Sequence, residues 1–138
     1  MIGSGEVLYH MTYIDDLVAG IILCGEHPNA VGNTYILAGP RWTTVSELVD
    51  AVALAEGRKA PRGHIPVWPV LAAATLCEWL CKPLKIEPPL HRRRLDFFLK
   101  DRAFSTARAR HDLGYEPRVD LDRGLRQTFA WYQAQGLV

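Results

Sequence analysis

The sequence has 138 residues, the length of one ordinary domain. Hydrophobic residues make up 49% and charged residues 22%, which is too apolar for a disordered chain. The formal net charge of +1 argues against a general nucleic-acid or membrane-surface binder, because such proteins need a basic field. Three cysteines and the lack of a signal-peptide pattern argue against a disulfide-framed secreted scaffold. We therefore expect a cytoplasmic protein.

The first 57 residues alternate between strand and helix patterns. Residues 7–14 form an apolar, aromatic-rich run of strand length. Residues 34–38 form a short unbroken apolar run, which is typical of a strand buried on both faces. Each run is followed by a helix pattern, so we expect an α/β fold with two short parallel strands in one sheet.

Capping residues mark the boundaries of these two helices. Asp15 stands where the N-cap of the first helix is expected, and Gly25 follows its last apolar position. Adjacent residues on a helix point about 100° apart, so Asp15 and Asp16 are interpreted as capping residues rather than as an acid–base pair. Thr44–Glu47 has the pattern of a capping box and predicts the start of the second helix.

Residues 58–138 are predicted to form a second, mainly helical part. Residues 68–81 are nearly all apolar, with Glu78 as their only charge. The run is shorter than the roughly 20 apolar residues of a membrane span, so we expect a buried helix and no membrane span. Further helices are expected at about residues 90–99, 106–114 and 121–135, the last of them capped by Asp120 or Asp122.

The sequence contains no convincing catalytic, metal-binding or cofactor-binding set of residues. No glycine-rich dinucleotide loop occurs between a strand and a helix, and no tyrosine has a lysine four residues later. Cys77 and Cys81 share a helix face without a nearby histidine, so they are interpreted as buried apolar side chains. The five histidines have no metal-ligand spacing and are scattered along the chain: His10, His27, His64, His91 and His111.

One basic and aromatic stretch is the best candidate for ligand contact. Arg92, Arg93 and Arg94 are consecutive, and Phe97 and Phe98 follow them. Arginine can hold a phosphate with two hydrogen bonds, and an aromatic ring can stack on a base. A solvated helix face explains the same residues, and the pattern alone leaves both interpretations open.

Four segments in chain order resemble the motifs of one enzyme family, the extended short-chain dehydrogenases/reductases, which include the NAD-dependent epimerases and dehydratases. Together they cover essentially the whole chain. The segments are Tyr9–Gly20 (hxxYVDDLxxG), Gly32–Gly39 with Thr44–Leu48 (GxxYx[IL]xG…TxxEL), Phe104–Arg108 with Leu113–Pro117 (FDxSKA…LG[YW]xP), and Gly124–Tyr132 (G[LI]xxTxxWY).

The resemblance implies the C-terminal part of that fold: the end of the Rossmann-like sheet in residues 1–57 and a substrate-binding subdomain in residues 58–138. It implies that the dinucleotide-binding half, with its glycine-rich loop and Tyr-x-x-x-Lys pair, lies before Met1. NAD or NADP would then serve the complete enzyme, an oxidoreductase, and this chain alone would bind neither cofactor and show no turnover. The substrate would be a nucleotide sugar or a similar small molecule, including steroid-like compounds.

Few site residues follow from the resemblance. Family members that act on nucleotide sugars hold the diphosphate with an arginine, for which Arg94 is the best match and Arg92 and Arg93 are alternatives. Asp96 would orient that arginine or contact the ribose, and Tyr13 would line the pocket. The sequence departs from the family pattern at two positions, Ser105 and Arg108, where many relatives have aspartate and lysine.

Two other functions remain open. The first is a non-catalytic module that dimerises, because the missing half would leave the strand at residues 7–13 and apolar faces exposed. Residues 68–81 would supply the contact in such a homo-oligomer. The second is nucleic-acid binding through residues 92–100, which the near-neutral charge argues against.

Overall fold

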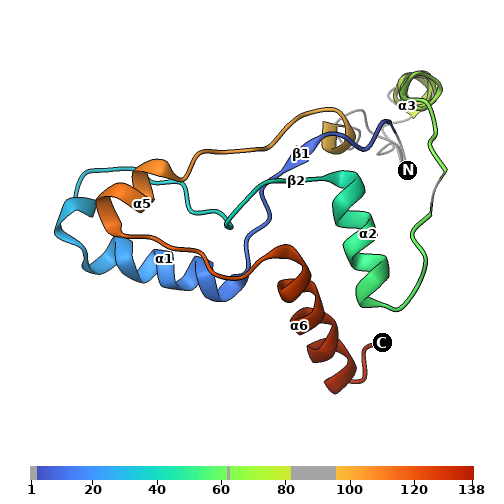
Figure 1. The fold of residues 1–138 in the computed structure, drawn as a ribbon. Coiled ribbons are helices and arrows are strands. Elements are labelled where there is room, and N and C mark those ends of the chain that lie inside the picture. Colours follow the sequence, from blue (N-terminus) through green and yellow to red (C-terminus); the bar gives the residue numbers. More distant parts are fainter. Residues whose placement is uncertain (1–2, 62, 82–95) are drawn as a thin grey trace. The chain divides into compact units, whose positions relative to one another are not determined.

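Figure 1 shows the chain in a computed structural model that describes residues 3–61, 63–81 and 96–138. The chain forms two compact units. One comprises Met1–Val7 and Pro61–Asp101, and the other comprises Leu8–Ala60 and Arg102–Val138. The sequence predicted a division between residues 57 and 58. The observed units differ because long-range contacts, described below, tie the C-terminal segment to the first 60 residues.

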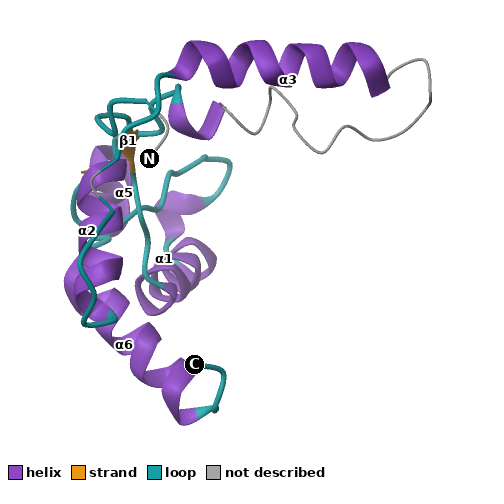
Figure 2. Cartoon of the chain, turned by 90° about the vertical axis from the view of Figure 1, so that its right-hand side faces the viewer, coloured by secondary structure: helices purple, strands orange, loops and turns teal. Residues whose placement is uncertain are grey.

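The larger unit, Leu8–Ala60 with Arg102–Val138, is mostly helical, as Figure 2 shows. Helix α6 packs on α2, and the short helix η1 contacts both α1 and α5. These elements span Ile14–Glu26 (α1), Pro28–Ala30 (η1), Val45–Ala55 (α2), Ala107–Leu113 (α5) and Leu121–Ala134 (α6).

Local hydrogen bonds explain where most of these helices begin and end. The predicted capping box is confirmed, because Thr44 Oγ1 accepts the Glu47 N–H at 3.1 Å and Glu47 Oε2 accepts the Thr44 N–H at 2.9 Å. Asp120 caps α6 by accepting the Arg123 N–H at 2.8 Å. Gly114 ends α5 with φ 66°, a left-handed conformation that glycine adopts without strain.

The predicted N-cap of α1 was wrong. Tyr13 is the N-cap and makes no side-chain capping bond, and Asp15 and Asp16 both lie inside the first turn. The carboxylate of Asp16 is buried and accepts the Arg118 N–H at 3.0 Å and the Val119 N–H at 2.9 Å. Asp16 is therefore structural, as expected, but it joins α1 to a segment about 100 residues away instead of capping its own helix.

The strand prediction also needs correction. Strands β1 (Leu8–Tyr9) and β2 (Thr43–Thr44) pair antiparallel, and no strand is assigned to residues 34–38. Side chains, rather than a neighbouring parallel strand, contact two carbonyl oxygens at the end of this segment. Tyr115 Oη donates to Ala38 O at 3.0 Å, and His10 Nε2 lies 2.9 Å from O of the next residue, Gly39.

The first strand does not present the open edge that the sequence suggested. Leu8 pairs with Thr44 on one side, and the Arg102 N–H donates to Leu8 O at 2.7 Å on the other. The Arg102 guanidinium also donates to the Tyr9 hydroxyl. Because both sides of β1 are occupied, this strand is a poor template for pairing with another chain.

Tyr115 fills the centre of the larger unit. It is the largest fully buried side chain among the described residues, and burial raises the pKa of its hydroxyl, with a further contribution from the charge of Asp16. A neutral hydroxyl can donate to Ala38 O. Gly20 allows α1 to approach this ring, since a Cβ there would lie 2.8 Å from Tyr115 Cε2 and 2.9 Å from Leu37 Cδ1.

The smaller unit contains α3 (Val67–Cys81) and the short helix η2 (Asp96–Phe98). The helix predicted over residues 68–81 is confirmed, but its expected burial is not: Ala74 is buried, whereas Trp68 and Trp79 are exposed. The apolar side chains of α3 point to all sides of the helix, so a single neighbouring segment cannot cover all of them. The helix predicted over residues 90–99 lies mostly outside the described residues.

None of the helices in the described part of the chain combines the length and the apolar character needed to cross a membrane.

Replacing Asp16 with alanine should unfold the larger unit more readily than replacing its neighbour. Asp16→Ala leaves two backbone N–H groups without their carboxylate, at a cost of about 2–3 kcal/mol in the free energy of unfolding. Asp15 is exposed and carries the same charge on the same helical turn. Asp15→Ala should cost less than about 1 kcal/mol, the scale of a helix-dipole interaction. Urea unfolding followed by circular dichroism measures both, and equal losses would contradict the role assigned to Asp16.

Candidate functional site

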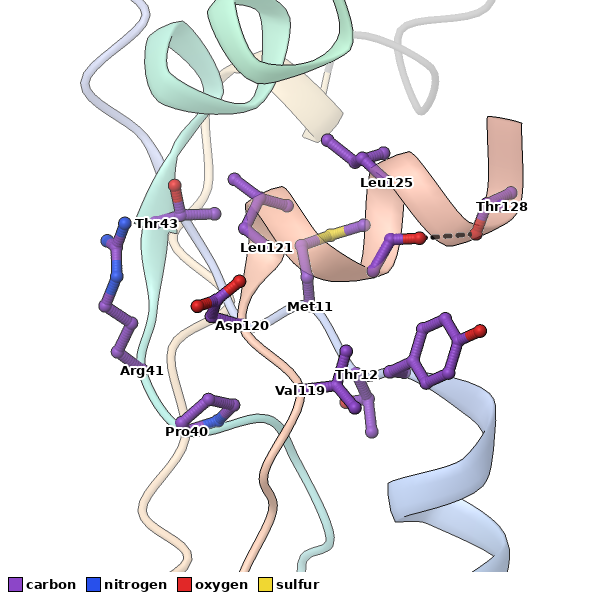
Figure 3. Close-up of a pocket in the computed structure, with 12 residues that line it drawn as sticks. Met11, Thr12, Pro40, Arg41, Thr43, Val119, Asp120, Leu121, Leu125 and Thr128 are labelled. Atoms are coloured by element: carbon purple, nitrogen blue, oxygen red, sulfur yellow. Dashed lines mark hydrogen bonds between the residues drawn. The ribbon is translucent and has the colours of Figure 1, made fainter. Parts of the chain in front are cut away.

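A cavity of about 130 Å³ lies in the larger unit, between the segment Met11–Tyr13, the Pro40–Thr43 turn and the start of α6 (Figure 3). Apolar side chains dominate its wall, with Met11, Leu121 and Leu125 among them. Its polar groups come from three elements that the fold brings together. The full lining is Met11, Thr12, Tyr13, Pro40, Arg41, Thr43, Val119, Asp120, Leu121, Gly124, Leu125 and Thr128.

The Asp16 contact and the Asp120 cap build one wall of this cavity. Asp16 holds the backbone of Arg118 and Val119, and Asp120 begins α6 immediately afterwards. The first turns of α6 therefore face Met11–Tyr13. Gly124 leaves room for the Tyr13 ring, because a Cβ there would lie 3.1 Å from Tyr13 Cδ2. The Thr128 hydroxyl donates to Gly124 O at 2.8 Å, as Figure 3 shows.

A small polar cluster stands at the Pro40–Thr43 side of the cavity. The Thr43 hydroxyl donates to Glu47 Oε2 at 2.6 Å, and Arg41 Nη1 lies 3.4 Å from the same oxygen. Hydrogen bonds from the Thr43 hydroxyl and from the Thr44 N–H, with a smaller contribution from Arg41, hold the pKa of Glu47 below its ordinary value. Glu47 thus remains charged at neutral pH and faces Arg41.

Of the predicted site residues, the structure places Tyr13 in the cavity. Asp96 lies in η2 of the smaller unit, where its carboxylate accepts a hydrogen bond from Lys100 Nζ at 2.7 Å. Arg92, Arg93 and Arg94 lie outside the described residues, so the suggested pairing of Asp96 with an arginine stays a prediction.

Sequence reasoning missed most of the cavity residues. Met11, Arg41, Thr43 and Leu121 are ordinary residue types from three distant segments, and no motif joins them. The capping pattern at Asp120 was the one available signal, because it fixes which residues form the first turn of α6.

The two cysteines of α3 lie close together on one face of that helix. Cys77 Sγ and Cys81 Sγ are 4.0 Å apart, and both thiols are free. Burial, and then the Cys77 side chain, raises the pKa of Cys81, which is the opposite of what an activated thiolate requires.

Comparison with known proteins places this arrangement in one fold. No protein-family model matches the sequence. The sterol-4-alpha-carboxylate 3-dehydrogenase erg26 of Schizosaccharomyces pombe, described as decarboxylating, is 31% identical over 97% of this chain and 41% of its own length. The crystal structure of gox2253 superposes with a TM-score of 0.75 at 28% identity, covering 99% of this chain and 39% of that one. Nearly the whole chain therefore shares its fold with about two fifths of these longer proteins.

A further solved structure has the same fold over nearly the whole chain. The UDP-glucuronic acid 4-epimerase of Bacillus cereus, solved in complex with NAD, gives a TM-score of 0.64 at 18% identity, over 98% of this chain and 34% of that one. The expected fold class is confirmed, apart from the strand pairing corrected above. The chain spans about two fifths of the length of the curated relatives it matches.

The low pKa of Glu47 predicts a pH dependence of stability. Because folding lowers this pKa, the carboxylate stabilises the fold at pH values above its ordinary pKa of 4.5, and the stabilisation is lost as pH falls through the lowered pKa. Glu47→Gln keeps an acceptor for the capping box but cannot titrate. Its melting temperature should therefore fall less than that of the original protein between pH 6 and pH 3, in thermal unfolding experiments.

Asp50→Asn is the matched control for this measurement. Asp50 is an exposed carboxylate on the same helix, α2. Its replacement should leave the acid dependence of the melting temperature unchanged. If Asp50→Asn and Glu47→Gln behaved alike, the hydrogen bonds to Glu47 would not be the source of the dependence.

Proposed function

We propose that this chain is the substrate-binding part of an NAD(P)-dependent epimerase, dehydratase or dehydrogenase, and that it is inactive without the dinucleotide-binding part. The observation that carries this proposal is that nearly the whole chain matches about two fifths of the length of sterol and steroid dehydrogenases and about a third of an epimerase. In the complete enzyme, hydride would pass between a substrate carbon and the nicotinamide. The portion described here would hold the substrate.

Two substrate classes follow from the relatives. Sterol dehydrogenases are among the sequence relatives, and enzymes solved with UDP-glucose or UDP-glucuronic acid are among the structural ones. For a nucleotide sugar, Arg94, with Arg93 beside it, would hold the diphosphate, and Asp96 would orient that arginine or contact the ribose. Within the larger unit, Tyr13 and the apolar cavity that it lines are a separate candidate contact for a sugar or a sterol ring.

A ligand that binds only the folded chain raises its melting temperature, which separates the two classes. We expect UDP-glucose to raise it on the order of 5–10 °C at about 100 times its dissociation constant. Arg94→Ala should abolish this rise, and Arg126→Ala, an exposed arginine on α6, should leave it intact. Stabilisation by a 3β-hydroxysterol but not by any UDP compound would contradict the nucleotide-sugar assignment. No stabilisation by either class would contradict substrate binding by this chain.

The purified chain should show no turnover with NAD and either substrate class, because the glycine-rich loop and the Tyr-x-x-x-Lys pair do not occur in its sequence. Absorbance of NADH measures net oxidation of a sterol, whereas epimerisation or dehydration of a nucleotide sugar returns the hydride to the product and is measured by chromatography of the sugar product. Sustained formation of NADH or of sugar product in proportion to the amount of chain would contradict the proposal that catalysis needs a further part.

A second candidate function is self-association, which the surface of α1 favours. Asp16 and Gly20 are buried on one side of this helix, whereas Ile14, Val18 and Ile21 are exposed on the opposite side. These three residues recur at helical spacing, and Ile22 beside them is also exposed. We call Ile14, Val18, Ile21 and Ile22 the α1 stripe. Contiguous apolar surface of this kind is typical of an interface.

If a second copy covers the α1 stripe, the protein will be a dimer by light scattering. Val18→Glu places a charge in the middle of the stripe and should convert the dimer to a monomer. Ala19→Glu places the same charge on the same helix, at an exposed position off the stripe, and should leave the dimer intact. A monomeric mass for the unmodified chain would contradict this function.

A further inference from the structure

A second and larger cavity lies on the other side of the Pro40–Arg41 turn. Its volume is about 470 Å³, within the range of small-molecule sites. One wall is the Pro40–Trp42 turn, and the other is the segment Ala103–Ala107 with Arg110 from α5. All of these residues belong to the larger unit.

Two side chains join the walls of this cavity. His10 Nε2 lies 2.9 Å from Gly39 O, and its Nδ1 lies 3.0 Å from Phe104 O. Arg110 Nε donates to Thr106 Oγ1 at 3.1 Å, and Arg110 Nη2 donates to Pro40 O at 3.5 Å. Arg110 thus bonds the two walls to each other, and the ring nitrogen of His10 that carries the proton adds a hydrogen bond to one of the two carbonyl oxygens. These bonds hold the walls together before any ligand arrives.

The lining is basic. His10, Arg41 and Arg110 line the cavity, and neither aspartate nor glutamate does. The two bonds of Arg110 use two of the five N–H groups of a guanidinium. Arg41 contacts Glu47, which lies outside the lining, and the backbone oxygen of Trp42 at 3.2 Å. Two guanidinium groups on one cavity favour a ligand with a phosphate or carboxylate group.

The same cavity carries two exposed aromatic rings. Trp42 is 56% exposed and Phe104 is 50% exposed, one on each wall. Aromatic side chains stack on the flat face of a base, and such stacking is independent of the hydrogen-bonding edge of that base. Basic groups and aromatic rings on one preformed cavity suit a ligand that has both an anionic group and a planar ring.

We propose that this cavity binds a nucleoside monophosphate, with its phosphate at Arg41 and Arg110 and its base against Trp42 and Phe104. A purely apolar ligand would leave the remaining N–H groups of the two guanidinium groups without a ligand contact, and an inorganic anion would leave both rings exposed. The site is distinct from the apolar cavity of Figure 3, although Pro40 and Arg41 line both. The proposal does not rest on the proposed function, because it concerns the chain alone.

Isothermal titration calorimetry of the 138-residue chain with uridine monophosphate, adenosine monophosphate and inorganic phosphate tests the proposal. Both nucleotides should bind saturably, about tenfold or more tighter than phosphate, because stacking adds to the phosphate contacts. Arg41→Gln and Arg110→Gln should each weaken nucleotide binding at least about tenfold, through loss of a charge-assisted contact. Trp42→Ala should weaken nucleotide binding about tenfold and leave phosphate binding unchanged.

Two matched variants control for charge and for aromatic surface. Arg126→Gln removes the same charge from an exposed position outside the cavity. Trp131→Ala removes a tryptophan that is also 56% exposed, on α6. Both should bind the nucleotides as the original chain does. Melting temperatures identify any variant that fails to fold, and Arg41→Gln, at an exposed side chain, keeps the test decisive if Arg110→Gln unfolds.

Three results would overturn the proposal. The first is no saturable nucleotide binding at millimolar concentration. The second is phosphate binding as tight as nucleotide binding, which would rule out the base contact. The third is an equal loss of affinity in the control variants. Arg94→Ala should bind both nucleoside monophosphates as the original chain does, which separates this cavity from the UDP-glucose contact proposed at Arg94.

Discussion

The larger unit depends on one buried carboxylate. Asp16, in the first turn of α1, accepts hydrogen bonds from the backbone of Arg118 and Val119. A carboxylate that receives backbone N–H groups in a buried place forms stronger hydrogen bonds than a neutral acceptor does. This contact fixes the start of α6, which then packs on α2 and forms one wall of the apolar cavity. The helical arrangement and the cavity thus share one cause.

Elsewhere in this unit, extended segments are joined by contacts between side chains and backbone oxygens. In a larger sheet, hydrogen bonds between the backbones of neighbouring strands would join them. Tyr115 donates to Ala38, and His10 contacts the carbonyls of Gly39 and Phe104. Each contact spans a long stretch of sequence and joins extended chain without a neighbouring strand. Backbone oxygens that lack such partners would be costly to bury. This explains how residues 34–39 stay ordered with only two short strands nearby.

Local features of the fold could be predicted from the sequence, and long-range ones could not. The Thr44–Glu47 capping box, the Gly114 end of α5 and the Asp120 cap each depend on residues within one helical turn. The partner of Asp16 depends on which segment lies beside α1, which only the assembled fold decides. An aspartate pair at the start of a helix pattern looks the same whether it caps that helix or binds elsewhere.

The residues of the candidate site, too, could be predicted only where a local sequence pattern marked them. Tyr13 was found because a family motif contains it, whereas Met11, Arg41 and Leu121 come together only in the assembled fold, through the Asp16 contact, the β1–β2 pairing and the packing of α6 on α2. The second cavity was missed for the same reason. Arg41 and Trp42 lie on one segment and Arg110 on another, and no motif joins them; the sequence analysis instead favoured the three consecutive arginines at residues 92–94.

The exposed surface of α1 gives the remaining physical constraint. A solvent-facing helix usually buries its apolar side and exposes its charges. In α1 the buried side carries Asp16 and Gly20, and the α1 stripe is exposed. Hydrogen bonding at Asp16 stabilises this reversed arrangement in a single chain. Contact of the apolar stripe with water is nevertheless unfavourable, so covering the stripe would stabilise the protein further. A helix with an anchored polar side and an apolar outer side is suited to lie between two layers of protein. The larger unit supplies one of those layers, and in the self-association proposed above a second copy of the chain would supply the other.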